Sequence, residues 1–463
     1  MRALGVVKLY RITQNQLTLE DFIFEYGTLN QNDEWIQLSY LMPWAKIEKK
    51  YAQNFINNGN PAHNVRIAVG ALIVQQKLKC SDENLVTFIS QNPYLQYFIG
   101  MKEYTYSCPF GASTLVAFRK RITPEMLAEI NEMIIPENES GPDDGENGGT
   151  LILDATCVPA DISFPQDIRL LNDARVKTEQ IIDELHRKRN DRKPRTYRKK
   201  ARKAYLKISK SKKRSGKMVR TGIKQQLQYL LRNLSNIAGM VATGSQLSTN
   251  NVRVLTIVSE LYRQQKEMYD EKKHNIADRI VNLFQPHIRP VVRGKAKAKT
   301  EFGAKLHISM TNGYTRIERV EYDVFNEAMD FTAILERYKE RNERYPERVL
   351  ADRIYRNREN IAYCKSRGIK MSGPALGRPK KDVRTDKKQE YQDICERNAV
   401  EGKFGEGKKA YGLDRVSSRL KQTSLCVISV AILAMNLSKR LRSLFVYFSN
   451  WVISMFRNAY RFV

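Results

Sequence analysis

Three acidic residues stand where their side chains could hold a metal ion. Asp154 follows the apolar run "TLIL", Asp352 follows "RVLA", and Glu401 lies in "ERNAVEGKFGEGKKAYGLDR" (396–415). Carboxylates from separate elements can share Mg²⁺, which prefers oxygen ligands and leaves room for water and phosphate oxygens. Two such ions about 3.5–4 Å apart activate an attacking oxygen and stabilise a leaving oxygen in phosphoryl displacement. The three acids therefore predict metal-assisted phosphodiester chemistry.

Two cations accompany Glu401 at helical spacing. Arg397 stands four residues before it and Lys408 seven after it, so at 3.6 residues per turn all three lie on nearly one helix face. An Arg fork and a Lys point charge suit phosphate contacts beside metal ions. Each acid also has an ordinary explanation, because an Asp after a strand is usually a cap or turn residue and Glu401 could be part of a structural ion pair.

The same segment is rich in glycine, with Gly402, Gly405 and Gly407 inside the predicted helix. Each glycine costs roughly 1 kcal/mol against alanine in a helix interior. Local propensity does not explain three of them. We therefore expect these glycines to allow close approach of backbone or DNA.

The composition favours a polyanionic partner. The chain has 463 residues, with 79 Lys and Arg against 50 Asp and Glu, and a formal net charge of +29. Such a charge suits nucleic acid or an acidic membrane surface, and charge alone does not choose between them. At about 100–200 residues per domain, the length predicts two to four domains.

More than half of the excess charge lies in one segment. Residues 187–224 hold 19 Lys or Arg and one Asp, a net +18, and both flanks show helical periodicity. We therefore predict a helical insertion at about 170–290 with a basic centre. It would bind phosphates without sequence preference and with strong salt dependence. The alternative is a solvated charge run. The predicted DNA contacts in this segment are Lys199, Lys200, Arg202 and Lys203.

Cysteine usage and the apolar runs bear on the compartment. Six cysteines are scattered singly without a C-x-x-C pair, which argues against a zinc knuckle or a disulfide framework and suits a reducing cytosol. The N-terminus lacks a secretory apolar region. The longest apolar run, "LCVISVAILAMNL", is about 13 residues, short of the roughly 20 that span a bilayer. We expect a buried helix there, a cytoplasmic protein and no membrane partner.

The first part of the chain predicts an all-α N-terminal domain over 1–135. Residues 34–135 show helical periodicity, and "GASTLVAFRKRI" carries Arg119 and Arg121 beside an apolar face. These arginines are candidate DNA contacts, although they could simply solvate a surface helix. An acidic stretch rich in Gly, Pro and Asn, residues 136–149, is typical of a linker.

The remainder predicts a mixed α/β domain over 150–440, interrupted by the insertion. "TLILDATCVPADI" indicates an apolar strand that ends in Asp154. "EFGAKLHISMTNGYTRIERVEYD" predicts two strands joined by an Asn-Gly turn. A helix, a short apolar strand ending at Asp352 and another helix follow. Residues 441–463 are predicted to form a C-terminal helical tail.

These ordered blocks resemble the DDE transposases of bacterial insertion sequences, in the group marked by a Tyr-(2)-Arg-(3)-Glu-(6)-Lys signature. Arg397, Glu401 and Lys408 match this signature at the expected spacing. The chain departs at the first position, where Ile394 replaces the tyrosine and Tyr391 is out of register. That departure puts a tyrosine role in doubt.

The other blocks resemble the remaining motifs of that group. "LILDATCVPADI" is similar to the first block and "LADRIYRNREN" to the middle one, so Asp154 and Asp352 correspond to the first and second acids. The accessory residues that the resemblance suggests are Tyr355 and Asn360 in the middle block and Lys305 and His307 in "FGAKLHIS". His307 is more simply a satisfied, partly buried histidine than a metal ligand.

The resemblance implies a ribonuclease-H-like catalytic fold, Mg²⁺ or Mn²⁺ as cofactor, and DNA as partner. The DNA would be the terminal inverted repeats of the element and the target, and the enzyme would cleave the ends and transfer their 3′-hydroxyls. Pairing two ends implies a homodimer, associated with the bacterial nucleoid in the cytoplasm. Two alternatives are a catalytically silent DNA-binding descendant and a nuclease of the same fold that never joins strands. A membrane-surface protein would not explain the three ordered blocks.

Some positions have competing interpretations. Asp161 and Asp167 follow closely on Asp154 and could supply the first acid, but only Asp154 ends an apolar strand. "GPALGRPKKD" (373–382) is either a DNA contact or an ordinary surface loop.

Overall fold

The computed structural model describes residues 17–53, 62–136, 147–187, 189, 191–292, 300–373 and 387–459, with side chains up to residue 446. The chain divides into two compact units. Unit 1 comprises residues 1–159, 305–320 and 325–463, and unit 2 comprises residues 160–304 and 321–324. Residues 137–146 of the acidic linker and residues 374–382 of the segment 373–382 lie outside the described part of the chain.

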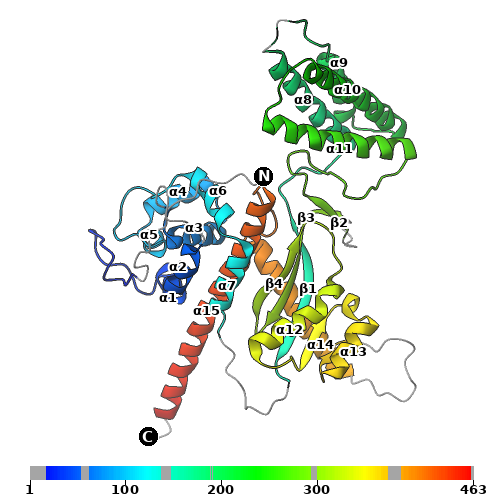
Figure 1. The fold of residues 1–463 in the computed structure, drawn as a ribbon. Helices are drawn as coiled ribbons and strands as arrows, with labels where there is room; N and C mark the ends of the chain where they lie inside the picture. The colour runs from blue at the N-terminus through cyan, green and yellow to red at the C-terminus, as the bar shows by residue number, and fades with distance from the viewer. Residues whose placement is uncertain are drawn as a thin grey trace, which may run out of the picture. The chain divides into compact units, whose positions relative to one another are not determined.

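A six-stranded mixed sheet positions the predicted acids (Figure 1). Its strands are β1 (Thr150–Pro159), β2 (Arg289–Val292), β3 (Thr300–Thr311), β4 (Tyr314–Glu321), β5 (Arg348–Ala351) and β6 (Lys370–Met371). The order is β2-β3-β1-β5-β6, and β4 also pairs with β3. β5 runs parallel to both β1 and β6, whereas β2 runs antiparallel to β3. The mixed α/β prediction is therefore confirmed in outline.

The predicted hairpin is present. β3 and β4 are joined by Asn312 and Gly313, whose φ angles are 52° and 74°. Two central residues with positive φ are what the common two-residue hairpin turn requires, and an Asn-Gly pair adopts them at the lowest cost. The Asn-Gly pair predicted this turn correctly because both residues adopt the positive φ angles that the turn requires.

The prediction that the first strand ends at Asp154 is wrong. β1 continues to Pro159, and the Ala160 N–H donates to the Phe302 carbonyl at 2.9 Å, near the start of β3. β5 ends at Ala351, so β1 loses its partner on that side while β3 continues to pair on the other. Asp154 thus lies where the β1–β5 pairing stops, inside a longer strand.

Helices cover the two faces of the sheet. η1 (Glu327–Asp330), α12 (Phe331–Asn342), η2 (Arg353–Tyr355) and α13 (Arg358–Ser366) follow in the chain, and then α14 (Lys387–Ala410). Leu151, Leu153, Val349 and Ala351 share one core cluster with α12 and α13. Side chains alternate along a strand, so Asp154 and Asp352 point to the other face. α14 packs against β1 and β5 there (Figure 1).

The N-terminal helices form a module that includes the last helix of the chain. The module contains α1 (Glu34–Leu41), α2 (Trp44–Ala52), α3 (Val65–Leu78), α4 (Asp82–Gln91), α5 (Pro93–Phe98), α6 (Ala112–Arg121), α7 (Pro124–Ile134) and α15 (Lys421–Ala459). Ser81 caps α4, because its side chain accepts from the Asn84 N–H at 3.2 Å. α15 packs against α1, α3, α6 and α7.

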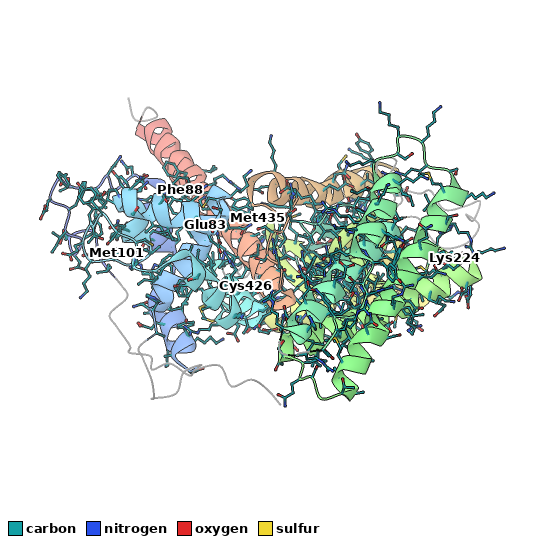
Figure 2. The ribbon with its side chains drawn as sticks, turned by 90° about the horizontal axis from the view of Figure 1, so that it is seen from above. Glu83, Phe88, Met101, Lys224, Cys426 and Met435 are labelled. Atoms are coloured by element: carbon teal, nitrogen blue, oxygen red, sulfur yellow. The ribbon has the colours of Figure 1, made fainter. Side chains whose placement is uncertain are left out.

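The predicted buried apolar helix is confirmed, but it is much longer than the apolar run. Cys426 and Met435, labelled on α15 in Figure 2, are 0% and 1% exposed. The span Lys421–Val446 is long and apolar enough to cross a membrane, and 78% of its most apolar window is buried inside the protein. The predicted boundary at residue 440 falls inside α15, so residues 441–459 continue that helix.

A buried asparagine pair joins the module to the sheet. Asn436 of α15 accepts from the Thr315 N–H at 2.9 Å and donates to the Thr315 carbonyl at 2.7 Å and to Asn131 of α7 at 2.8 Å. Asn131 also donates to the Thr315 carbonyl at 3.1 Å. Buried polar groups that are all satisfied fix one arrangement of the elements that carry them. α7, β4 and α15 are therefore held in a single register.

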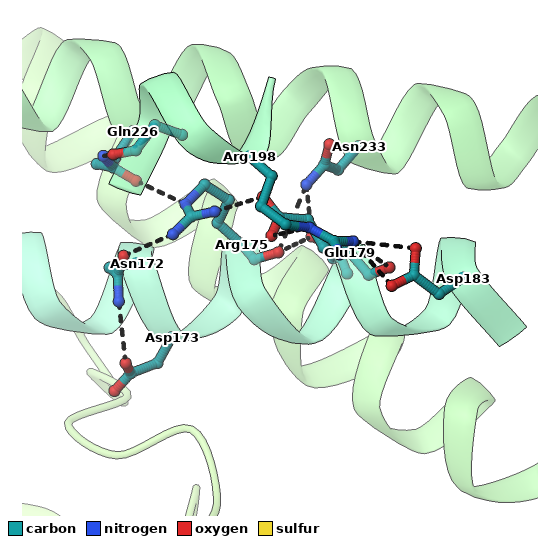
Figure 3. A network of polar contacts seen from close by, with 10 residues as sticks. Asn172, Asp173, Arg175, Glu179, Asp183, Arg198, Gln226 and Asn233 are labelled. Atoms are coloured by element: carbon teal, nitrogen blue, oxygen red, sulfur yellow. Dashed lines mark hydrogen bonds and ion pairs between the residues drawn. The ribbon is translucent and has the colours of Figure 1, made fainter. Parts of the chain in front are cut away.

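The predicted insertion is a helical bundle that forms most of unit 2. Its helices are α8 (Asp167–His186), α9 (Arg198–Ser209), α10 (Gly216–Ala242) and α11 (Thr249–Glu271). A polar network ties α9 to α8 (Figure 3): Arg198 pairs with Glu179 at 3.1 Å and with Asp183 at 2.9 Å, and Glu179 also binds Arg175. Residues 198–209 of the basic centre thus form a folded helix.

Candidate active site

Two of the three predicted acids lie side by side. In the parallel pairing of β1 with β5, Leu153 stands opposite Ala351, which makes Asp154 and Asp352 the next residues on the two strands. The carboxyl ends of adjacent parallel strands meet at one edge of a sheet, and both side chains point to the α14 face. The backbone therefore brings together residues that are 198 positions apart in the chain.

Local hydrogen bonds orient both carboxylates in the same way. Asp154 Oδ1 accepts from the Ala155 N–H at 2.7 Å, and Asp352 Oδ1 accepts from the Arg353 N–H at 2.6 Å. Asp352 is also the N-cap of η2, and its side chain is 60% exposed. An N-cap carboxylate satisfies a backbone donor, and carboxylate oxygens are ligands that Mg²⁺ prefers.

α14 delivers the third acid to the same end of the strands. At the start of β5, Arg348 donates to Asp393 at 3.0 Å and to Glu396 at 2.8 Å. At the end of β5, Arg397 Nη1 lies 3.9 Å from Asp352 Oδ1. α14 therefore runs along β5 toward its carboxyl end, and Glu401 lies one helical turn, about 6 Å, farther on.

All three acids have the carboxylate oxygens that Mg²⁺ prefers as ligands, and Asp154 and Asp352 also lie beside each other on adjacent strands. Within the described residues, no group of three or more His, Cys, Asp or Glu side chains is close enough to hold a metal ion. Glu401 is exposed, while Val400 beside it is fully buried against the sheet. Completing a three-carboxylate site thus requires the Glu401 side chain to turn toward the strand ends.

The signature residues around Glu401 divide by exposure. Arg397 and Lys408 are half-buried on the side of α14 that faces the sheet. Ile394 and Tyr391 are 55% and 68% exposed, so neither fills a buried tyrosine position on this helix. The phosphate-binding roles of Arg397 and Lys408 stay predictions.

The three glycines of α14 are not equivalent. A Cβ on Gly407 would lie 2.8 Å from Leu413 Cδ1 and 3.1 Å from Met435 Sδ, so these two side chains would have to shift to accept it. A Cβ on Gly402 or Gly405 would meet nothing within 4 Å. Of the three glycines, only Gly407 is therefore packed closely against another part of the protein.

The four accessory residues all take part in buried contacts behind the acids. His307 is fully buried, and its Nε2 lies 2.9 Å from the Tyr355 hydroxyl. Asn360 donates to the Tyr355 carbonyl at 2.9 Å. Lys305 donates to the Phe325 carbonyl at 2.6 Å and pairs with Glu327 at 2.9 Å. The contact with Tyr355 satisfies one ring nitrogen of His307, while the buried Nδ1 has no hydrogen-bond partner among the described residues.

Sequence reasoning missed the acids that surround His307. Asp330 Oδ2 lies 3.8 Å from His307 Nδ1, and Asp330 Oδ1 lies 3.3 Å from Arg319. Both Asp330 and Glu327 belong to η1, a short turn without periodicity. The spacing of Lys305 and His307 could have predicted these acids. Residues two positions apart lie on one face of a strand, and two basic side chains buried there need acidic partners.

The competing first acids are placed away from the strand ends. Asp167 begins α8 and binds Arg279 at 2.6 Å and Gln265 at 2.9 Å. Asp161 is exposed and follows the end of β1. Both belong to unit 2, whereas Asp154, Asp352 and Glu401 belong to unit 1.

The two candidate DNA contacts of the N-terminal module have structural partners. Arg119 is 6% exposed, donates to Gln75 at 2.7 Å and pairs with Asp82. Burial would raise the pKa of Asp82, but hydrogen bonds from Arg119 and Gln75 outweigh it and hold that pKa below its usual range. Arg121 lies against the Tyr51 hydroxyl. These contacts explain both arginines without DNA.

The basic residues of α9 are different. Ala201 and Ile208 are buried, while the basic side chains are exposed. Arg198 pairs with Glu179 and Asp183, but no carboxylate partner is found in the described part of the chain for the basic residues that follow it on α9. The exposed basic residues of this surface, which we call the α9 face, are Lys199, Lys200, Arg202, Lys203, Lys207 and Lys210. Lys224 of α10 lies at the edge of the same bundle (Figure 2). Lys207 and Lys210 were not among the predicted contacts.

Comparison with known proteins gives two family matches. A family described as a transposase DDE domain matches residues 349–438, which include Asp352 and Glu401. A family described as a transposase domain matches residues 25–121, within the N-terminal module. A protein of Rhizobium meliloti named as uncharacterized protein ORF8 in the nfe locus is 29% identical over 143 residues, covering 31% of this chain and 69% of that protein. No solved structure matches the chain.

Proposed function

From the resemblance to insertion-sequence DDE transposases, which the two family matches confirm, we propose that this chain cuts the ends of an insertion element and joins them to target DNA. The observation that carries the proposal is the register of β1 and β5. It sets Asp154 beside Asp352 on the face covered by α14, the helix that carries Glu401.

We propose a ribonuclease-H-like fold for the sheet and its helices. In support, the central strand β1 has an antiparallel hairpin on one side and the parallel strands β5 and β6 on the other. The long connection from β1 to β3 carries the helical insertion. Asp352, just after the end of β5, is 60% exposed, and Asp154 lies beside it where the β1–β5 pairing stops.

The proposed chemistry proceeds in two displacements. Water attacks a phosphorus atom at the element boundary, the bond to the 3′-oxygen breaks, and a 3′-hydroxyl and a 5′-phosphate result. The freed 3′-hydroxyl then attacks a target phosphorus atom, and the target 3′-oxygen leaves. When bound, Mg²⁺ or Mn²⁺ would activate the attacking oxygen and stabilise the leaving one.

The chain's own residues supply geometry and charge. Asp154, Asp352 and Glu401 would hold the metal ions, while Arg397 and Lys408 would hold the phosphate beside them. In unit 2, the α9 face would bind the DNA backbone through counterion release. The terminal inverted repeats, a homodimer on paired ends and a place at the bacterial nucleoid belong to this same proposal.

The test is cleavage of a labelled duplex that carries the flanking element end, with Mg²⁺ or with EDTA. Wild type is expected to nick at the element boundary only with the metal, and Asp352→Asn is expected to bind the duplex without nicking it. Tight binding without nicking by wild type would favour a silent DNA-binding protein. Nicking without joining when target DNA is added would favour a nuclease of the same fold.

A further inference from the structure

One buried side chain, that of Tyr355, holds the turn that carries Asp352 in place. Arg353 and Ile354 of η2 are exposed, whereas Tyr355 is 1% exposed and packs in the core cluster beneath the strands. The Tyr355 N–H donates to the Asp352 carbonyl at 3.1 Å, which closes the turn. The direction of the Asp352 carboxylate therefore depends on where Tyr355 is held.

His307 forms a hydrogen bond with the hydroxyl of Tyr355. The Tyr355 hydroxyl lies 2.9 Å from His307 Nε2 on β3. Because the strand order is β3-β1-β5, a bond from the end of β5 to β3 crosses beneath β1, the strand that carries Asp154. This hydrogen bond therefore joins the turn at the end of β5 to β3, on the other side of β1.

The contact joins two buried side chains. Burial lowers the pKa of His307, so the imidazole is neutral and carries one proton. Either the Tyr355 hydroxyl donates to Nε2 or Nε2–H donates to the hydroxyl oxygen, and in both cases the bond holds the turn that carries Asp352 against β3. The other ring nitrogen, Nδ1, lies 3.8 Å from Asp330 Oδ2.

We infer that Tyr355 and His307 form a positioning pair, which fixes the carboxylate of Asp352 relative to that of Asp154 for metal binding. This inference rests on the proposed function, because it assigns these residues to the support of the same site. Neither side chain contacts the substrate. Partners behind a ligand commonly matter to metal affinity or activity by about 10–100-fold.

Tyr355→Phe tests the pair, because it removes the hydroxyl and keeps the ring in the core. Tyr338→Phe is the matched control: Tyr338 is 2% exposed in the same cluster, and its hydroxyl donates to the Gly148 carbonyl at 2.8 Å, before the start of β1. Both variants lose one buried hydroxyl hydrogen bond. They are expected to lower the melting temperature similarly.

Two readouts then separate positioning from stability. Mn²⁺ binding to the DNA-free protein, followed by water-proton relaxation, is expected to weaken about 10–100-fold in Tyr355→Phe and to stay unchanged in Tyr338→Phe. The boundary cleavage rate is expected to follow the same pattern. His307→Gln keeps an acceptor for the hydroxyl and should retain more activity than His307→Leu, and adding Tyr355→Phe to His307→Leu should cost little more.

Equal Mn²⁺ binding and cleavage in Tyr355→Phe and Tyr338→Phe would overturn the positioning pair while leaving the transposase assignment intact. A wild type that neither binds Mn²⁺ nor cleaves the element end would instead overturn the proposed function, and the pair's role with it. The wild-type measurement therefore distinguishes the two failures.

Discussion

Arg397 Nη1 lies 3.9 Å from Asp352 Oδ1, so the signature arginine of α14 is paired with the second predicted acid. The arginine side chain is 26% exposed and the carboxylate 60% exposed. This contact fixes the position of α14 along β5. It also places a cation where a metal ion would have to bind, so arginine and metal compete for one carboxylate.

Arg397→Ala is expected to strengthen Mn²⁺ binding to the DNA-free protein by about 1.5–5-fold, the range typical of an exposed ion pair. Cleavage is expected to fall, because the phosphate contact is lost. Arg397→Lys, which keeps the charge, serves as the control and should leave Mn²⁺ binding closer to wild type. Weaker Mn²⁺ binding in Arg397→Ala would contradict the competition.

Glu401→Gln should retain DNA binding and abolish boundary cleavage, because an amide oxygen is a poor substitute for a carboxylate on Mg²⁺. Glu390→Gln makes the same change eleven residues earlier on α14, about 16 Å along the helix. This control should cleave at the wild-type rate. Metal-dependent cleavage by Glu401→Gln would remove Glu401 from the site.

Replacing Lys199, Lys203 and Lys207 with Gln should weaken DNA binding broadly and reduce the slope of log K against log salt by up to about 0.9 per lost phosphate contact. Fluorescence anisotropy across a salt series measures the slope. Substitution is preferable to deleting 187–224, because that segment contains α9 and the start of α10.

The matched control for this triple variant lies on the same bundle. Arg263 and Lys266 of α11 and Lys273 just after it pair with nearby acids at the surface. Their replacement with Gln should leave the slope close to wild type. An equal change of slope in both triple variants would mean that the α9 face is not the phosphate contact.

Alanine substitutions in α14 should separate packing from DNA approach. Gly402→Ala and Gly405→Ala are each expected to stabilise the fold by about 1 kcal/mol, because their Cβ atoms meet nothing within 4 Å. Gly407→Ala should destabilise it through contact with Leu413 and Met435. If DNA approaches Gly402 and Gly405, the first two variants also bind DNA more weakly; unchanged affinity would rule out that explanation.

His307 makes stability depend on pH with a defined sign. Burial lowers its pKa against the opposing charges of Glu318, Asp330 and Glu327, and Lys305 adds to the lowering. Between its folded pKa and its unfolded value near 6.5, the unfolded state binds more protons, so the free energy of unfolding falls as pH falls through that window.

The slope from this one histidine is at most about 1.4 kcal/mol per pH unit. His307→Gln should flatten the curve of stability against pH below about 6.5, the unfolded pKa of histidine. Urea denaturation at each pH measures the difference. A curve with the wild-type slope in His307→Gln would assign the dependence to another group.

Much of the site followed from local sequence signals. An apolar run followed by an acid located Asp352 just after the end of β5, and it located Asp154 where the β1–β5 pairing stops, although β1 itself continues. The Asn-Gly pair located the hairpin for an equally local reason. The length of β1 did not follow, since its extension to Pro159 depends on pairing with β3, a strand that begins 141 residues later.

The sequence also did not show which distant residues the charged side chains contact. Arg119 looked like a surface cation because its counter-charge, Asp82, lies 37 positions away on α4. Asp330, which accompanies His307, comes from a turn without periodicity. Nothing in a local window shows which distant side chain a buried charge will meet.

The place of α15 has a consequence for the order in which the protein is made. The N-terminal module ends at Ile134, and α15, which packs among its helices, begins at Lys421, so 286 residues separate the two. Synthesis at about 5–20 residues per second takes roughly 15–60 s over that distance. During this time the module lacks Cys426 and Met435, the buried side chains of its last helix. A nascent chain therefore completes its first module only after the whole α/β part has emerged from the ribosome, and a prematurely terminated chain leaves that module without its last helix.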